Sequence, residues 1–301
     1  MMDSPSARGV VLALLAYAFF AVSDASVKLL HGGLDPFQVS FIGALLGFSV
    51  LPFIHGRGMP WRSLLATRRR GLWLLRGLMA ALGSVCSVTA FTRLPMAEAF
   101  ALLFLLPTFV TILSVLFLKE QVGWRRWSAV IVGFAGVLIV LRPGFRELTL
   151  GHVAAIIGGF AGAVTVVLMR ALGRTESRAS LYLSGLLGIL AVCGALMLPN
   201  LAWPSAMQWV WLLGYGLLAA VAGVLIQAAS AAAPVSLTAP TQYSQMLWAI
   251  GFGYWVFGDR LDVWTFAGAA VIVGSGLFTL ARERARRSPG GGGAPPVRSD
   301  G

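Results

Sequence analysis

Three ionisable side chains in the first long apolar stretch of this sequence could bind or move charge. Tyr17, Asp24 and Lys28 share one face of a predicted helix, and the spacing of Asp24 and Lys28 suits an ion pair. An ionisable group inside a membrane-spanning helix costs about 3 kcal/mol, so it usually faces a cavity or a partner. Two interpretations follow: a gate or proton-linked site, or a structural pair that neutralises itself.

A polar stripe in the predicted helix 235–257 suits the binding of a small solute. The stripe consists of Thr238, Thr241, Gln242 and Gln245. Pro240 interrupts the same helix, and transporters place solute ligands on broken helices beside a cavity. We predict a solute site here, joined by Gln227 and Ser230 of the preceding helix. The alternative is hydrogen bonding that only holds helices together, worth about 0.6 kcal/mol per contact.

Further candidates come from aromatic and acidic residues near these helices. Trp248 and Tyr17 are added to the predicted solute-binding set, with Phe100, Phe104 and Tyr243 as rings that would stack on a flat solute or simply pack. Glu98 follows a proline near the start of the predicted helix 96–118. It either caps that helix, where the helix dipole favours a carboxylate, or exchanges a coupling proton.

The sequence lacks the catalytic motifs of several enzyme classes. The lysines are Lys28 and Lys119, and neither belongs to a GxxxxGK[ST] loop, so hydrolysis of ATP by a P-loop is excluded. The three histidines do not form an HExxH motif. Ser275 has no obvious base on a neighbouring helix, which leaves an intramembrane enzyme as a weak alternative. We expect no catalytic residue, metal site or cofactor.

Composition places these residues in a membrane protein. Hydrophobic residues make up 58% of the 301 residues, charged residues only 11%, and the mean hydropathy is +0.83. Continuous apolar runs long enough to cross a hydrocarbon core of about 30 Å predict helices rather than a barrel. The fold class is therefore all-α integral membrane. The expected transmembrane spans are 9–30, 36–55, 71–92, 96–118, 124–141, 150–172, 178–198, 207–230, 235–257 and 262–281.

The distribution of basic residues explains the net charge of +12 without a nucleic-acid partner. With a cytoplasmic amino terminus, 18 of the 23 lysines and arginines fall on the inside. The protein is thus expected in the inner (plasma) membrane with both termini cytoplasmic. The partners expected are the lipid bilayer and a small-molecule solute, and a homodimer is left open. Residues 282–301, basic and then rich in Gly and Pro, are expected to be a disordered tail.

The ten spans divide into two similar halves. Glu120 and Asp259 each follow a long apolar run and lie 139 positions apart, while Lys28 and Arg170 differ by 142. Pro95 and Pro234 repeat the offset of 139. The halves are 9–144 and 150–281. Because each contains five spans, the two copies insert in opposite orientations, as in transporters built from inverted repeats.

Two stretches carry a resemblance to a known family. They are LPMAEAFALLFLLPTFVTILSVLFLKEQVGWRRWSAVIVGFAGVLIVLRPG in the first half and APVSLTAPTQYSQMLWAIGFGYWVFGDRLDVWTFAGAAVIVGSGLF in the second. They resemble the EamA type of the drug/metabolite transporter superfamily over residues 9–281. The resemblance implies a ten-helix basket around a central solute cavity, with cytoplasmic termini.

The resemblance also implies a function. Relatives that export amino acids favour proton-coupled export of an amino-acid-derived solute, including amino-acid-built metal chelators. Lys28 and Arg93 near the outer mouth would suit a carboxylate on that solute. The main alternative is import of a vitamin or nucleoside-like solute such as riboflavin or S-adenosylmethionine. A membrane scaffold is disfavoured because the loops are short.

Overall fold

The computed structural model describes residues 5–55, 60–65, 67–120, 123–142, 147–173, 175–233, 235–260 and 262–287. Within these ranges the chain forms helices and short connections, with no strand. The α-helices are α1 (Pro5–Leu29), α2 (Pro36–Gly47), α3 (Leu51–Ile54), α4 (Arg70–Arg93), α5 (Met96–Leu103), α6 (Leu106–Leu118), α7 (Trp124–Leu141), α8 (Leu150–Leu172), α9 (Arg178–Leu196), α10 (Ala206–Ala232), α11 (Val235–Thr238), α12 (Ser244–Trp255) and α13 (Val263–Arg287).

All ten predicted spans coincide with helical segments. Seven stretches in the described ranges are long and apolar enough to cross a membrane, and shorter apolar helices occupy Val130–Leu141 and Val263–Phe278. The remaining predicted span, 235–257, is built from α11, a 3₁₀ segment over Ala239–Tyr243, and α12. The chain is therefore a multi-pass helical membrane protein.

The fourth and ninth spans are interrupted helices. The fourth divides into α5 and α6 next to Pro107, whose ring lacks an N–H and clashes with the carbonyl four residues earlier. Pro240 lies in the 3₁₀ segment that interrupts the ninth span, as the sequence predicted. Each half therefore has a break in the equivalent helix, where backbone and side chains can face a cavity.

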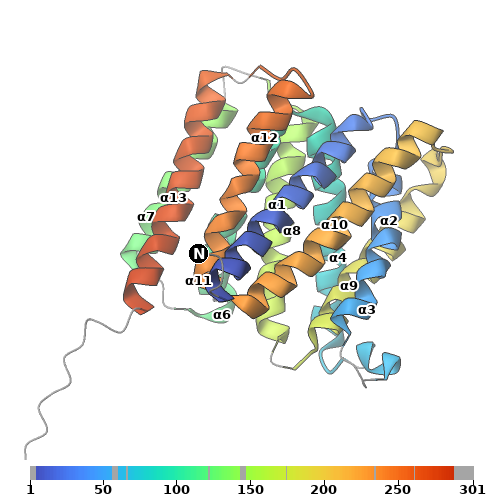
Figure 1. The fold of residues 1–301 in the computed structure, drawn as a ribbon, viewed down its shortest axis with the longest axis horizontal. Helices are drawn as coiled ribbons and strands as arrows, with labels where there is room; N and C mark the ends of the chain where they lie inside the picture. Colours follow the sequence, from blue (N-terminus) through green and yellow to red (C-terminus); the bar gives the residue numbers. More distant parts are fainter. Residues whose placement is uncertain are drawn as a thin grey trace, which may run out of the picture.

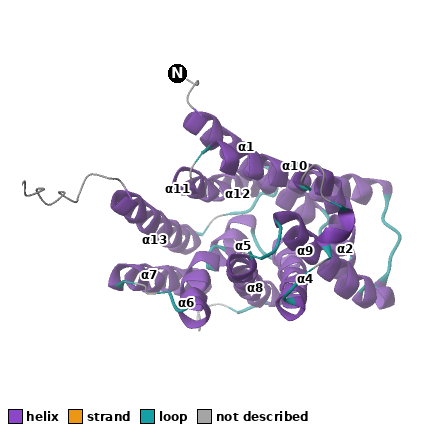
Figure 2. Ribbon diagram, turned by 90° about the horizontal axis from the view of Figure 1, so that it is seen from below, coloured by secondary structure: helices purple, strands orange, loops and turns teal. Residues whose placement is uncertain are grey.

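Helix packing follows the twofold pattern of inverted repeats. The first helix of each half packs along the third helix of the other half, α1 on α10 and α8 on α4. The last helices, α7 and α13, pack together along one edge of the bundle (Figure 1). Viewed from below, α5 lies between the layer of α1, α10 and α12 and the layer of α4, α6 and α8 (Figure 2). The exact limits of the two halves stay a prediction.

The two ends of the described chain lie at the same end of the bundle, as an even number of spans requires (Figure 1). Helix α13 continues to Arg287, so residues 282–287 are helical and not part of a disordered tail. Arg, Glu and Ala in this segment are good helix formers, which explains the difference. Residues 288–301 lie outside the described residues.

Candidate functional site

A central cavity of about 350 Å³ lies between the two halves. Helices α1, α4, α5 and α6 of the first half line it together with α8, the 3₁₀ segment and α12 of the second half. Three glycines of α8, Gly158, Gly159 and Gly162, belong to the lining, and their lack of a side chain lets Leu103 and Leu106 approach α8 closely. The volume falls in the range of pockets that bind small molecules.

The cavity wall combines a few polar groups with aromatic rings. Its polar side chains are Asp24, Ser84, Ser87, Thr165, Gln242 and Gln245. Its aromatic members are Phe91, Phe100 and Phe104, whose neighbouring ring centroids are 5.0 Å and 6.0 Å apart. Tyr243 extends this row of rings, 5.6 Å from Phe104. A mostly apolar pocket with a few convergent polar groups is typical of a small-molecule site.

The 3₁₀ segment separates the polar stripe predicted for the ninth span. In a continuous α-helix its four residues would share one face, but a 3₁₀ helix has 3.0 residues per turn and rewinds the backbone. Gln242 and Gln245 line the cavity. Thr238 and Thr241 are buried outside the lining, and the Thr241 hydroxyl donates a hydrogen bond to the Thr238 carbonyl at 2.6 Å. This pair holds the backbone of the interrupted helix.

Four other predicted solute-binding residues lie outside the lining. Ser230 is exposed and donates to the Ile226 carbonyl of its own helix, and Gln227 is half-buried. Trp248 is 42% exposed and stacks on Phe252. Tyr17 contacts Phe20, although it shares a helix face with Asp24. The lining residues that sequence reasoning missed, Ser84, Ser87, Phe91 and Thr165, lie on α4 and α8, where they are scattered among small apolar residues.

Lys28 pairs with Asp259 and not with Asp24, which corrects the expected pair. Its ammonium lies 2.7 Å from Asp259 Oδ2, donates to the Leu94 carbonyl at 3.0 Å, and sits 4.9 Å from the ring of Phe257. The Met96 amide also donates to Asp259 Oδ2, at 2.9 Å. The pair joins the end of α1 to the turn after α12 and the α4–α5 connection. The Met96 amide fixes the Asp259 carboxylate within reach of the Lys28 ammonium, while Asp24 lines the central cavity.

A second ion pair occupies the equivalent position in the inverted repeat. Arg170 corresponds to Lys28 in the sequence repeat, and Glu120 corresponds to Asp259. Arg170 Nη1 lies 3.9 Å from Glu120 Oε1, and the two side chains are 52% and 39% exposed. The Lys28 and Asp259 side chains are only 13% and 17% exposed. The ion pair between the two halves is thus short and largely buried at one end of the bundle, and long and more exposed at the other.

Glu98 forms a buried pair with His152 at the same end of the bundle as Lys28 and Asp259. Glu98 Oε1 lies 2.9 Å from His152 Nε2, and the residues are 1% and 2% exposed. The Thr149 amide donates to His152 Nδ1 at 3.0 Å, so this nitrogen carries no proton. The imidazole is therefore the Nε2–H tautomer and donates to the Glu98 carboxylate. Glu98 thus joins α5 to α8, which goes beyond capping its own helix.

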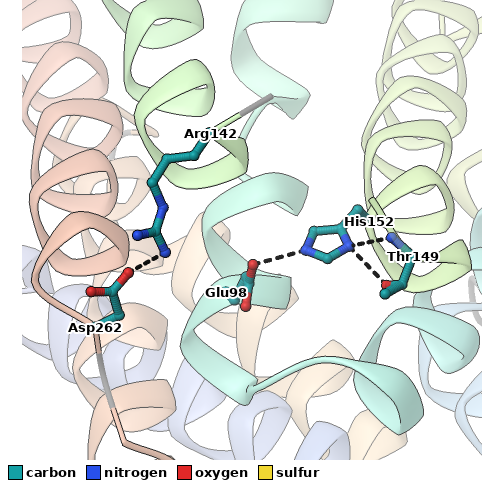
Figure 3. Close-up of polar contacts among 5 residues, drawn as sticks. All are labelled: Glu98, Arg142, Thr149, His152 and Asp262. Carbon is teal, nitrogen blue, oxygen red and sulfur yellow. Dashed lines mark hydrogen bonds and ion pairs between the residues drawn. The ribbon is translucent and has the colours of Figure 1, made fainter. Parts of the chain in front are cut away.

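A second, smaller space of about 50 Å³ lies next to Glu98. Asp259, Arg260, Asp262 and Thr265 line it with Glu98. Asp262 also pairs with Arg142 at the end of α7, beside the Glu98–His152 contact (Figure 3). This polar space is large enough for at least one water molecule, and the three carboxylates of Glu98, Asp259 and Asp262 line it.

The fold and the cavity define a multi-pass helical membrane protein whose two halves enclose a central, solute-sized space. The chain belongs to the EamA-like transporter family: the family's model matches residues 7–142, and a riboflavin transporter of Vibrio cholerae is 30% identical over 276 residues. That alignment covers 90% of this chain and 92% of the relative.

Other relatives are also named transporters. An S-adenosylmethionine uptake transporter of Rickettsia felis is 25% identical over 92% of this chain and 93% of its own length. A pseudopaline exporter of Pseudomonas aeruginosa is 26% identical over 88% of this chain and 93% of its own length. A protein of known crystal structure shares the fold with a TM-score of 0.64 at 18% identity, covering 94% of this chain and 99% of that one.

Proposed function

We propose that this chain is a secondary transporter of the inner membrane that exports a small amino-acid-derived solute, driven by protons, and that it is not an enzyme. The observation that carries the proposal is the central cavity of about 350 Å³, lined by both halves and polar at only a few points. A space shared by two inverted halves is where such transporters bind their solute. The sequence has no P-loop, so a gradient supplies the energy.

The two equivalent ion pairs support alternating access to this cavity. Lys28–Asp259 is short and shielded, while Arg170–Glu120 is long and exposed. We assign the first pair to the outer gate and the second to the inner gate, because the distribution of basic residues puts both termini in the cytoplasm. Closing one gate while the other opens would expose the cavity to each side in turn.

Inward transport of a vitamin or nucleoside-like solute is the second candidate. The relative named as an S-adenosylmethionine uptake transporter favours the inward direction. The relative named as a riboflavin transporter favours a flat solute, which the row of aromatic rings also suits. The relative named as a pseudopaline exporter favours the outward direction. Both candidates use the same cavity and the same gates.

Comparative metabolomics of cells and medium tests this proposal. The strains are a deletion, its complement with the wild type, and complements carrying Gln242→Ala with Gln245→Ala or the control Ser230→Ala, at matched expression. We expect one solute to accumulate inside the deletion and to disappear from its medium. The double variant should copy the deletion, because the two glutamines line the cavity. Ser230→Ala should copy the wild type, because the Ser230 hydroxyl is exposed and lies outside the lining. A solute that the deletion fails to acquire would establish import, and unchanged metabolites in all strains would contradict transport.

A further inference from the structure

The central cavity contains one charged side chain among the lining residues that the structure describes, Asp24 of α1. No lysine, arginine or histidine belongs to this lining. The remaining polar members are neutral hydroxyls and amides. Asp24 is therefore the described lining side chain that can carry a charge opposite a solute.

The Asp24 carboxylate has no hydrogen-bond or ion-pair partner in the described part of the chain. The nearest cation along its own helix, Lys28, lies one turn further and is engaged by Asp259 and the Leu94 carbonyl. An ionised carboxylate without a countercharge is costly in a membrane protein. A cationic ligand would offset that cost, whereas an anionic ligand would add to it.

Other side chains that line the same cavity offer oxygen atoms to an ammonium group. The Thr165 hydroxyl lines the same cavity and is buried without a hydrogen-bond partner in the described residues. Gln242 and Gln245 offer amide oxygens, and an ammonium carries three donors that such oxygens can accept. Phe91 and Phe100 also line the cavity, and aromatic rings attract cations over their faces and pack against apolar groups.

We propose that Asp24 selects solutes that carry a positively charged amino group, with the aromatic row receiving the apolar part of the solute. This inference rests on the proposed transport function and names the charge of its substrate. It also replaces the expectation that Lys28 and Arg93 would attract a carboxylate, because Lys28 is already neutralised by Asp259. Asp24 is thus a substrate-binding residue, and Lys28 belongs to the gate.

Four derivatives of one amino acid test the charge preference. At mildly acidic pH phenylalaninamide is a cation, phenylalanine a zwitterion, N-acetylphenylalanine an anion and N-acetylphenylalaninamide neutral, and all share one aromatic ring. Binding to the purified full chain in lipid nanodiscs is measured from the dependence of the thermal midpoint on probe concentration. Wild type is compared with Asp24→Asn, Asp24→Glu and the control Ser230→Ala, whose hydroxyl lies on the surface.

We expect phenylalaninamide to bind the wild type most tightly, phenylalanine less tightly, and the two acetylated probes at least about tenfold more weakly than phenylalaninamide. Asp24→Asn should remove this preference, and Asp24→Glu and Ser230→Ala should keep it. Midpoints without probe show whether each variant folds. Equal binding of the acetylated probes, a preference that survives Asp24→Asn, or no binding of any of the four would overturn the inference.

A flux measurement separates failure of this inference from failure of the proposed function. The solute identified by metabolomics is loaded into proteoliposomes with wild type or Asp24→Asn. Flux of an anionic or neutral solute that is equal in both proteins would refute the role of Asp24 and leave transport intact. Flux of a cationic solute that falls at least about tenfold in Asp24→Asn would support both. If metabolomics identifies no transported solute, the proposed transport function itself is refuted.

Discussion

At the scale of single residues, the structure pairs charged side chains differently from the pairing that helical spacing predicted. The helical spacing of Asp24 and Lys28 predicted a local pair, but Lys28 reaches Asp259, 231 positions away in the chain. Spacing along one helix can identify residues that share a face, yet it carries no information on which distant turn approaches that face. Asp24 is left facing the cavity as a result. Glu98 was recognised from its position, while its partner His152 was not predicted.

The buried Glu98–His152 pair gives a prediction about proton coupling. The neutral imidazole donates to the Glu98 carboxylate, which is buried between α5 and α8 and is our candidate for the group that exchanges the coupling proton. In proteoliposomes, we expect the flux driven by a pH gradient to fall at least about tenfold in Glu98→Gln. Exchange of solute between the two sides without a gradient should be retained. Equal gradient-driven flux in Glu98→Gln and wild type would assign coupling elsewhere.

At the scale of elements, the apolar runs predicted every helix, and prolines predicted one of the two important interruptions. Pro240 indicated the break in the ninth span because proline removes a helical hydrogen bond. The sequence could not show that the break would be a 3₁₀ segment, which divides the predicted stripe into cavity-facing glutamines and packed threonines. The direction of a side chain depends on the number of residues per helical turn, so a short 3₁₀ segment turns the residues on its two sides toward different faces.

Close packing of α4 against α9 gives a prediction about stability. A Cβ added at Gly188 would overlap the backbone of Gly77, so the two helices would have to separate. We expect Gly188→Ala to destabilise the protein by about 1–3 kcal/mol and to lower its thermal midpoint in detergent. Gly223→Ala in α10 is the control, since a Cβ there meets no atom within 4 Å. A Gly188→Ala protein as stable as the control would contradict this packing.

At the scale of the whole molecule, the sequence repeat predicted two inverted halves, and the structure adds how their helices pack. Matching positions such as Lys28 with Arg170 and Glu120 with Asp259 form two ion pairs, each of which joins the two halves. Which residues pair across the halves could not be predicted, because the repeat relates equivalent positions and not contacts. The two pairs differ in length and exposure, so the two ends of the bundle are not alike.

The central claim is that one cavity opens to either side of the membrane in turn, with Lys28–Asp259 as the outer gate. The most direct test is labelling of Ser87→Cys, a cavity position, by a membrane-impermeant maleimide added from either side. The free cysteines Cys86 and Cys193 are first replaced by serine. Ile131→Cys, exposed on the outer face of α7, is the control that should react from neither side.

We predict slow labelling of Ser87→Cys from outside and faster labelling from the cytoplasmic side, since the outer pair is the tighter one. Asp259→Asn removes the countercharge of Lys28, so it should raise the outside rate at least about tenfold and lower the inside rate. Labelling from one side alone that Asp259→Asn does not change, or labelling from neither side, would contradict alternating access through this cavity.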